Sequence, residues 1–297
     1  MAEWSWETKY LERPDAKIRY SICRPSQQAA KQVIYLANGR TEWIEKYNRI
    51  PERLNLGPDY EFVLWDHRGQ GASSGKRGDI RSYDQFNDDM AALVAETAKG
   101  RPYSVVAHSM GALISLTTTL RGLIKPRMLV LSSPLFLIPE TTMKRHYARK
   151  ISFLCSRTFL GAKCVSPKES EIAFENNQLT HSQANYKIIL NSPYKVPSPT
   201  FNWVYATFQA TDLIMDPKLL EQLSCPVHLL SGTEETVVDR NGFELWREKA
   251  RQHAKVEIDH QIIAGGRHEL LFESDPYLAK AVDKIRNWLV QRQDNTL

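Results

Sequence analysis

The chain has 297 residues, which is enough for one large domain or for a domain that carries an insertion. Hydrophobic residues make up 42% of it, an ordinary share for a globular core, and no apolar run approaches the roughly 20 residues of a membrane-spanning helix. The net charge of +5 is mildly basic and no DNA- or RNA-binding motif accompanies it, so we expect no nucleic-acid partner.

The N-terminal residues and the cysteines indicate a cytoplasmic protein. Residues 1–10 carry charges and lack the apolar segment of a secretory signal. The cysteines form no CxxC pair and no plausible zinc set with histidine, so we expect free thiols and no metal. They are Cys23, Cys155, Cys164 and Cys225.

The first elements in chain order are two strands, at 17–23 and 33–37, and a helix at 43–56. Between the second strand and the helix lies a glycine-bearing turn, Asn38-Gly39-Arg40. The backbone N–H of Arg40 is a candidate to stabilise a negative charge that develops on a bound carbonyl oxygen. On this segment alone, a plain strand-to-helix turn remains an equally open interpretation.

A third strand, at 61–65, runs into a loop at 66–73 whose glycines permit a tight reversal. We expect Asp66 and Arg68 to brace this loop. His67 has no acidic partner at a recognisable spacing, which favours a structural role for it.

Residues 82–98 are predicted to form a helix. Ser82 and Gln85 match a capping box at its start, and Gly100 is expected to end it. The helical period also gives it one apolar face, formed by Phe86, Met90, Leu93, Val94 and Thr97.

The stretch 103–114 joins a short apolar strand to small residues that enter a helix, and Ser109 stands at the turn between them. This is the pattern of a nucleophile elbow, in which a strained backbone lifts a serine hydroxyl clear of the sheet. The positions two residues either side must be small, and Ala107 and Gly111 satisfy that requirement. Because a serine can also simply cap a helix, the chain must supply a base and an acid elsewhere.

A further strand at 128–131 continues an alternation of strands and helices that predicts a parallel sheet in a three-layer α/β fold. From 135 to 211 the alternation stops, and helical periods, aromatic clusters and prolines replace it. We interpret 135–211 as a mostly helical cap that would hold an apolar substrate and exclude water. Its basic cluster from Lys144 to Lys150 fits either a solvated helix face or contact with anionic lipid.

The alternation resumes after the cap, and this part of the chain offers the base and the acid. Strands are predicted at 227–231 and 256–263, a helix at 242–253, and a last helix from Pro276. His268 is the best candidate base because it lies on a compact glycine-rich loop between a late strand and the final helix. The loop after the preceding strand offers three candidate acids, which are Glu234, Glu235 and Asp239.

In combination these features resemble the α/β-hydrolase superfamily, and within it the bacterial lysophospholipase and monoacylglycerol lipase group. The resemblance extends along nearly the whole chain, through 38–42, 66–71, 86–89, 107–111, 180–182, 234–239 and 268–273. It implies a three-layer α/β-hydrolase sandwich, with a core formed by 1–134 and 212–297 and a helical cap, or lid, at 135–211.

The resemblance also implies a Ser-His-Glu triad. In this group the acid stands three residues after the glycine of its loop, which here is Glu235, so the implied triad is Ser109, Glu235 and His268. Because the usual acid at this place is aspartate, Asp239 remains the alternative.

The implied oxyanion hole consists of the backbone N–H groups of Arg40 and Met110. Many relatives carry His-Gly where this chain has Asn38-Gly39, a change that leaves the backbone donor in place. His181, in the segment 180–182, is a candidate contact for a substrate head group, although a structural histidine is the simpler interpretation.

The resemblance implies hydrolysis of the fatty-acyl ester of a lysophospholipid or a monoacylglycerol through an acyl-enzyme, without a cofactor and with contact at the inner face of a membrane left open. A carboxylesterase or an aminopeptidase on another small substrate is the alternative, although no acidic site for a substrate amine is identifiable. Epoxide hydrolases and dehalogenases need aspartate at the elbow, so Ser109 argues against them. A non-catalytic lipid-binding relative would not need both Ser109 and His268. The oligomeric state is not indicated.

Overall fold

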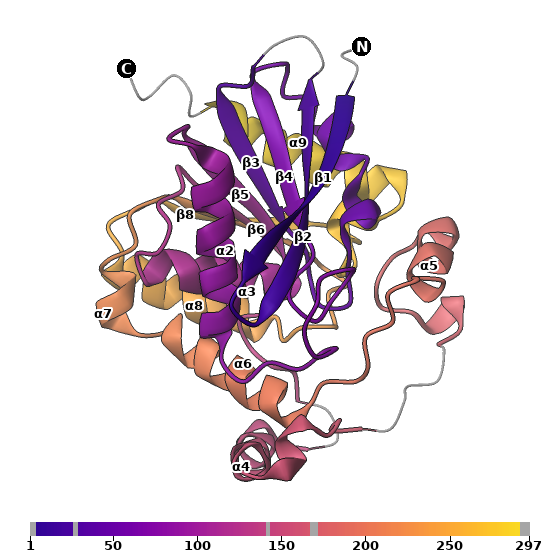
Figure 1. The fold of residues 1–297 in the computed structure, drawn as a ribbon, viewed down its shortest axis with the longest axis vertical. Coiled ribbons are helices and arrows are strands. Elements are labelled where there is room, and N and C mark those ends of the chain that lie inside the picture. Colours follow the sequence, from indigo (N-terminus) through magenta and orange to yellow (C-terminus); the bar gives the residue numbers. More distant parts are fainter. Residues whose placement is uncertain (1–3, 26–28, 141–142, 167–171, 292–297) are drawn as a thin grey trace.

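The computed structural model describes residues 4–25, 29–140, 143–166 and 172–291 (Figure 1). The strands are β1 (Trp4–Arg13), β2 (Ala16–Pro25), β3 (Gln32–Ala37), β4 (Tyr60–Trp65), β5 (Tyr103–His108), β6 (Leu129–Ser132), β7 (Val227–Gly232) and β8 (Ile258–Ile263). The α-helices are α1 (Ile50–Leu54), α2 (Tyr83–Ala98), α3 (Ser109–Leu120), α4 (Arg145–Ser156), α5 (Gln183–Leu190), α6 (Phe201–Leu213), α7 (Pro217–Leu220), α8 (Asn241–His253) and α9 (Asp275–Gln291). The 3₁₀ helices are η1 (Ile44–Tyr47), η2 (Phe159–Ala162), η3 (Phe174–Asn176) and η4 (Leu270–Phe272).

All of these strands form one eight-stranded sheet in the order β1-β2-β4-β3-β5-β6-β7-β8. β2 pairs antiparallel with both β1 and β4, and every other neighbouring pair is parallel. The crossovers of a parallel sheet place helices on both of its faces. The predicted α/β class with a mostly parallel sheet is therefore confirmed.

Each face of the sheet has its own hydrophobic core. Successive residues of a strand point to opposite faces, so in β3 Val33 and Tyr35 join the cluster that includes α2, α3 and α8. Ile34 and Leu36 join the second cluster, with α1 and α9. Figure 1 shows α2 and α9 on opposite sides of the strands, so the sheet is the middle layer of three.

Two elements differ from the predictions. β1 was not predicted, because most of its residues are exposed on both faces and no hydrophobic alternation marks it. The predicted helix at 43–56 is interrupted and consists of η1 and α1. Pro51 stands in the first turn of α1, where proline is tolerated, and Asn55 ends the helix with a left-handed φ of 45°.

The ends of α2 also differ in detail from the predictions. Ser82 caps the helix by accepting the N–H of Asp84 at 3.1 Å. Gln85 donates instead to Asp15 of the β1–β2 turn, so the reciprocal capping box is not formed. At the other end Lys99, with a φ of 50°, takes the left-handed cap position one residue before Gly100.

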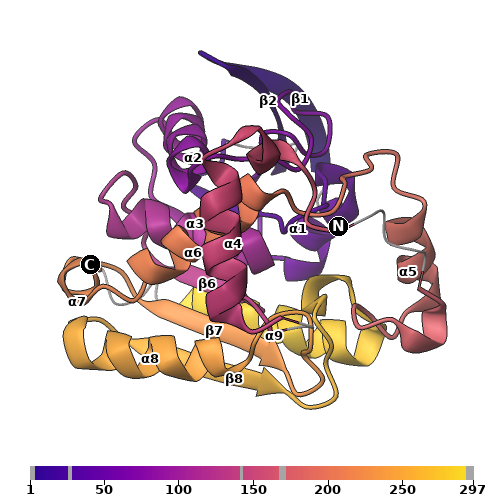
Figure 2. The ribbon, with the colours of Figure 1, turned by 90° about the horizontal axis from the view of Figure 1, so that it is seen from below.

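The segment between β6 and β7 is mostly helical where it is described. α6 packs against α2 and α3, and its residues Trp203, Ala206 and Ala210 belong to the core of one sheet face. α4 lies across α6 (Figure 2). The predicted cap range of 135–211 includes 141–142 and 167–171, which lie outside the described residues, and α6 continues past it to Leu213.

The four cysteines are free thiols, as expected. Within the described ranges, no helix combines the length and the apolar character that crossing a bilayer requires.

Candidate active site

Ser109 lies at the sharp turn between β5 and α3 and has a φ of +49°. This left-handed conformation is strained for a residue with a side chain, and it is the strain that was predicted for the elbow. A Cβ on Gly111 would lie 2.3 Å from the carbonyl oxygen of Asn38. The elbow therefore tolerates only glycine at position 111, because the start of α3 lies directly against the end of β3.

The register of the sheet brings the two predicted oxyanion residues to one edge. β3 and β5 are parallel neighbours, and Ala37 lies opposite Ala107. Arg40 and Met110 each stand three residues beyond these partners. Met110 is in the first turn of α3, where a backbone N–H has no acceptor within the helix. The two predicted donors therefore follow the carboxyl ends of adjacent strands, Arg40 in the turn after β3 and Met110 in the first turn of α3.

His67 supports the turn that carries Arg40. Its Nδ1 lies 3.1 Å from the donor Trp65 Nε1, so Nε2 carries the proton and donates to the carbonyl oxygen of Asn38 at 2.9 Å. Burial lowers the pKa of His67 to about 4, which keeps the ring neutral. The expected structural role of His67 is thus what its contacts support.

The side chain of Arg40 connects the same turn to the segment between β6 and β7, which is predicted to form the cap. Its guanidinium donates to the carbonyl oxygen of Pro197 and lies 5.2 Å from the centre of the Trp203 ring. The turn that presents the Arg40 amide is therefore held by the core on one side and by the cap on the other.

Glu235 and His268 form a buried hydrogen-bonded pair. Glu235 Oε2 lies 2.7 Å from His268 Nδ1. Its other oxygen accepts the N–H groups of Val237 and Val238 at 2.8 and 3.2 Å. Burial alone would raise the pKa of Glu235, but the His268 charge and these hydrogen bonds lower it. The carboxylate is therefore fixed and ionised beside the imidazole.

His268 lies next to the elbow. Its ring is 4.7 Å from the ring of His108, the residue that precedes Ser109. Burial would lower the pKa of His268, but Glu235, assisted by Glu269, raises it. Since Nδ1 is hydrogen-bonded to Glu235, Nε2 is the ring nitrogen that is left to exchange a proton with a reacting group.

The other two candidate acids have different partners. Asp239 forms a 2.5 Å ion pair with Arg145 at the start of α4. Glu234 lies 3.2 Å from His181 Nε2 and 3.4 Å from Arg267 Nε. Among the three acids of the loop, it is Glu235 that the structure places on His268.

The acid loop and the histidine loop are packed backbone against backbone. A Cβ on Gly232 would lie 1.9 Å from the carbonyl oxygen of Gly266, so a larger residue does not fit there. Two residues after Gly232, the N–H of Glu234 donates to that same carbonyl at 2.9 Å. This close approach lets Glu235 reach His268 from a neighbouring strand.

His181 is part of a junction between the cap and the histidine loop. Its Nδ1 lies 2.7 Å from Glu273 Oε1, and its ring stacks on Tyr277 with centroids 4.9 Å apart. Glu273 also accepts the backbone N–H of His181. These contacts favour the structural interpretation of His181 over a head-group contact.

The loop at 66–73 is braced as expected. Asp66 accepts Arg19 Nε at 2.6 Å and the N–H groups of Ala72 and Ile44 at 2.8 and 2.9 Å. Arg68 forms a bidentate pair with Asp89 on α2.

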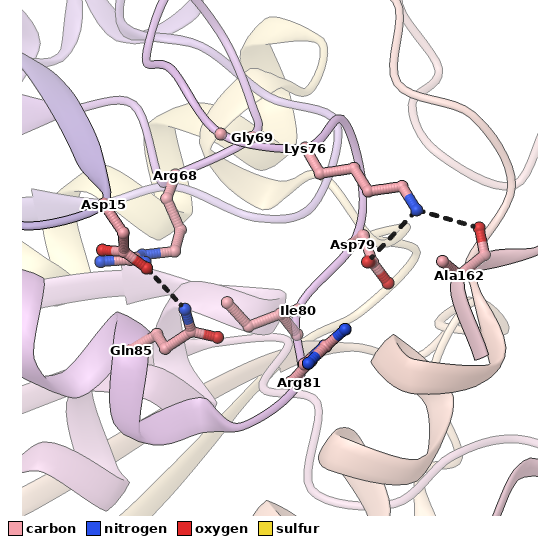
Figure 3. Close-up of a pocket in the computed structure, with 10 residues that line it drawn as sticks. Asp15, Arg68, Gly69, Lys76, Asp79, Ile80, Arg81, Gln85 and Ala162 are labelled. Atoms are coloured by element: carbon pink, nitrogen blue, oxygen red, sulfur yellow. Dashed lines mark hydrogen bonds and ion pairs between the residues drawn. The ribbon is translucent and has the colours of Figure 1, made fainter. Parts of the chain in front are cut away.

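A pocket of about 290 Å³ lies beside this loop, between the start of α2 and Ala162 of the cap (Figure 3). Four charged side chains of its lining form two ion pairs, Arg68 with Asp15 and Lys76 with Asp79, and Lys76 also donates to the carbonyl of Ala162. None of its lining residues belongs to the predicted triad or oxyanion hole. We interpret this pocket as a gap in the packing between the core and the predicted cap.

Lys46, which no motif in the sequence singled out, is buried close to the site. Lys46 donates to Glu42 and to Glu269, the residue after His268. The spacing of four residues between Glu42 and Lys46 is a recognisable helical ion-pair signal, but nothing in the sequence indicated that the pair would be buried.

The three-layer fold, the strained serine elbow and the buried Glu235–His268 pair at the carboxyl ends of the strands define an α/β-hydrolase. Residues 28–275 match the family described as serine aminopeptidase, S33. The chain belongs to this family.

Several proteins with different names as ester and lipid hydrolases are similar to this chain. A protein named probable lysophospholipase L2, from Haemophilus influenzae, is 26% identical over 298 residues, which cover 95% of this chain and 91% of that protein. The structure of a soluble variant of monoglyceride lipase from Saccharomyces cerevisiae, in complex with a substrate analog, matches with a TM-score of 0.79, 20% identity, and coverage of 96% and 95%. A carboxyl esterase from Bacillus coagulans in complex with glycerol matches with a TM-score of 0.78, 15% identity, and coverage of 96% and 98%.

Proposed function

We propose that this carboxylic ester hydrolase cleaves the fatty-acyl ester of lysophospholipids or monoacylglycerols, with Ser109, His268 and Glu235 as its catalytic triad. The observation that carries the proposal is the 2.7 Å contact of Glu235 with His268, next to the strained elbow at Ser109. The names of the relatives above supply the substrate class, and the apolar character of the cap suits a fatty-acyl chain.

In the proposed mechanism, His268 Nε2 takes the proton of the Ser109 hydroxyl as that oxygen attacks the ester carbonyl. Glu235 holds the imidazole in the required tautomer and stabilises its charged form. The tetrahedral intermediate then collapses to an acyl-enzyme, and His268 returns the proton to the leaving alcohol. Water activated by His268 attacks the acyl-enzyme and releases the fatty acid.

The oxyanion of the tetrahedral intermediate is proposed to lie between the backbone N–H groups of Arg40 and Met110. Backbone donors fixed on two adjacent strands need no reorganisation when the negative charge forms, and one such donor is commonly worth about 10²- to 10³-fold in rate. The anchoring of the Arg40 turn by His67 and Pro197 supports this preorganisation.

We further propose that residues 135–211 act as a cap over this site and that the outer side of α4 touches an anionic membrane surface. α4 buries the small residue Ser152, whereas Tyr147, Ile151 and Leu154 are exposed. Phe159, in the adjoining η2, is 84% exposed.

The charges around this apolar surface favour anionic lipid as its partner. Large exposed apolar side chains rimmed by cations are suited to the boundary between head groups and acyl chains. The exposed basic residues of this part of the cap are Lys144, Lys150, Arg157 and Lys163.

A serine-directed fluorophosphonate tests the proposed nucleophile. We expect the wild-type protein to be labelled at Ser109 and the Ser109→Ala variant to remain unlabelled and to lose several orders of magnitude in turnover. A hydrolysis panel then defines the substrate: lysophosphatidylcholine, lysophosphatidylethanolamine, monoacylglycerols, short p-nitrophenyl esters and amino-acyl amides. Preferential cleavage of amino-acyl amides would instead establish the aminopeptidase alternative, and absence of both labelling and turnover would leave a lipid-binding protein.

A further inference from the structure

A cluster of charged side chains is buried behind the predicted oxyanion turn and the histidine loop. Its members Glu42, Lys46 and Glu269 are 3%, 5% and 6% exposed. Lys46 Nζ donates to Glu42 Oε1 and, at 2.6 Å, to Glu269 Oε2. Burying three charges is unfavourable unless their mutual contacts are well formed, and apolar residues often serve stability equally well. The cluster therefore calls for an explanation other than stability.

Each carboxylate of the cluster is attached to a different part of the proposed machinery. Glu42 Oε2 accepts the backbone N–H of Gly39, the residue before Arg40, and the hydroxyl of Tyr47 at 2.8 Å. Glu269 directly follows His268 in the chain. Lys46 thus connects the peptide next to one proposed oxyanion donor with the residue next to the proposed base.

The cluster also reaches the elbow, through His108. Its Nε2 lies 3.5 Å from Glu269 Oε2 and 4.0 Å from Glu42 Oε1, and its ring contacts that of His268. Burial lowers the pKa of His108 to about 3, so this histidine, which directly precedes Ser109 in the chain, is neutral where it meets the cluster.

We propose that Lys46 is a positioning residue for the ester hydrolysis proposed above, on which this inference rests. Through Glu42 and Glu269, Lys46 fixes the distance between the Gly39–Arg40 turn and the His268 loop. It does not touch the reacting atoms and acts by keeping the oxyanion donor and the base in register with Ser109.

The charge balance explains why a cation is needed at this point. Burial and the nearby Glu42 charge raise the pKa of Glu269 to about 7, against the effect of Lys46. Burial opposes ionisation of Glu42 as well, but Lys46 and the backbone N–H of Gly39 lower its pKa to about 2. Without the ammonium the two buried carboxyl groups would face each other with no positive charge between them, so one of them would take up a proton and the link that Lys46 makes between the two loops would be lost.

The test compares three variants with the full-length wild-type protein. Lys46→Met removes the charge and keeps a similar length. Tyr47→Phe removes one hydroxyl from Glu42 and is a milder change. Lys284→Met alters an exposed lysine on α9 and serves as the matched control. The measurements are the second-order rate of fluorophosphonate labelling, kcat and KM on a short p-nitrophenyl ester, and the melting temperature.

We expect Lys46→Met to lower kcat and the labelling rate at least tenfold while KM stays within about twofold, and Tyr47→Phe to lower both rates two- to fivefold. Lys284→Met should match the wild type. A folded Lys46→Met protein with wild-type rates overturns the inference. If Lys46→Met does not fold, Tyr47→Phe decides, because unchanged rates in that folded variant overturn the inference as well. Failure of the wild-type protein to be labelled would instead refute the proposed function, before any variant is compared.

Discussion

Glu235 Oε2 and His268 Nδ1 lie 2.7 Å apart although the two residues are 33 positions apart in the chain. The contact raises the pKa of His268 and lowers that of Glu235, so the pair favours an ionised carboxylate and a readily protonated imidazole. A base must be neutral to accept a proton. Activity should therefore fall as the pH drops through the raised pKa of His268, which lies above the ordinary 6.5.

We expect Glu235→Gln to lower kcat by about 10²- to 10⁴-fold, because the imidazole loses its charged orienting partner. Removing that charge also lowers the pKa of His268, so the acidic limb of the kcat/KM profile should move to lower pH. Asp239→Asn is the matched control, since Asp239 pairs with Arg145, and it should keep the wild-type pH profile. A greater loss in Asp239→Asn than in Glu235→Gln would reassign the acid.

A methyl group at position 111 should disrupt the elbow. In Gly111→Ala the new Cβ would meet the carbonyl of Asn38 at 2.3 Å, which displaces either Ser109 or the end of β3. We expect a loss of about 1–3 kcal/mol in the free energy of unfolding and at least a tenfold loss in kcat. Gly100→Ala lies in open space and should affect stability alone. Urea unfolding and ester hydrolysis measure the two effects, and equal activity in both variants would contradict the steric account.

The buried carboxyl of Glu269 should make stability depend on pH. Its pKa in the folded protein is raised from the ordinary 4.5 to about 7, so its contribution is complete below pH 4.5 and is lost as the pH rises through 7. Glu269→Gln removes this dependence, so the stability of the variant relative to wild type should rise by about 3 kcal/mol between pH 4.5 and 7. Urea unfolding at several pH values measures the difference, with exposed Glu248→Gln as the control. A constant difference across that range would show that Glu269 does not titrate there.

If α4 and η2 contact the membrane as proposed, their exposed apolar residues should be needed for binding to lipid vesicles. We expect the wild-type protein to sediment with phosphatidylglycerol vesicles more than with phosphatidylcholine vesicles, and less as salt is added. The double variant Leu154→Ser/Phe159→Ser should lose most of this binding. Leu123→Ser, which changes an exposed leucine after α3, should retain it. Equal sedimentation of all three proteins would leave the cap surface without this role.

The sequence was informative wherever one physical requirement acts on neighbouring residues. Buried strands such as β3 and β4 appear as short apolar runs, because both of their faces are covered. The elbow is recognisable from a short stretch of sequence because small residues must flank Ser109. β1 is not recognisable in this way, since a strand exposed on both faces has no hydrophobic pattern.

Residues whose role depends on distant parts of the chain were harder to assign. Buried Lys46 contacts Glu269, which is 223 residues away in the chain, and no local pattern reports such a contact. Glu234, Glu235 and Asp239 were equally plausible acids from chemistry alone. Only the family spacing favoured Glu235, and the packing of Gly232 on Gly266 gives that spacing a physical reason.

The exposed outer strand β1 has a consequence for how the protein behaves in concentrated solution. It lies at the end of the sheet order, where an unpaired strand edge can recruit the same strand of another molecule. Glu7 and Lys9 form an ion pair on this strand, and Glu12 pairs with Lys17 of β2. A second strand edge placed against β1 would crowd and partly dehydrate these charges, which disfavours fibril-like association. Replacing the charged residues with apolar ones would remove that protection.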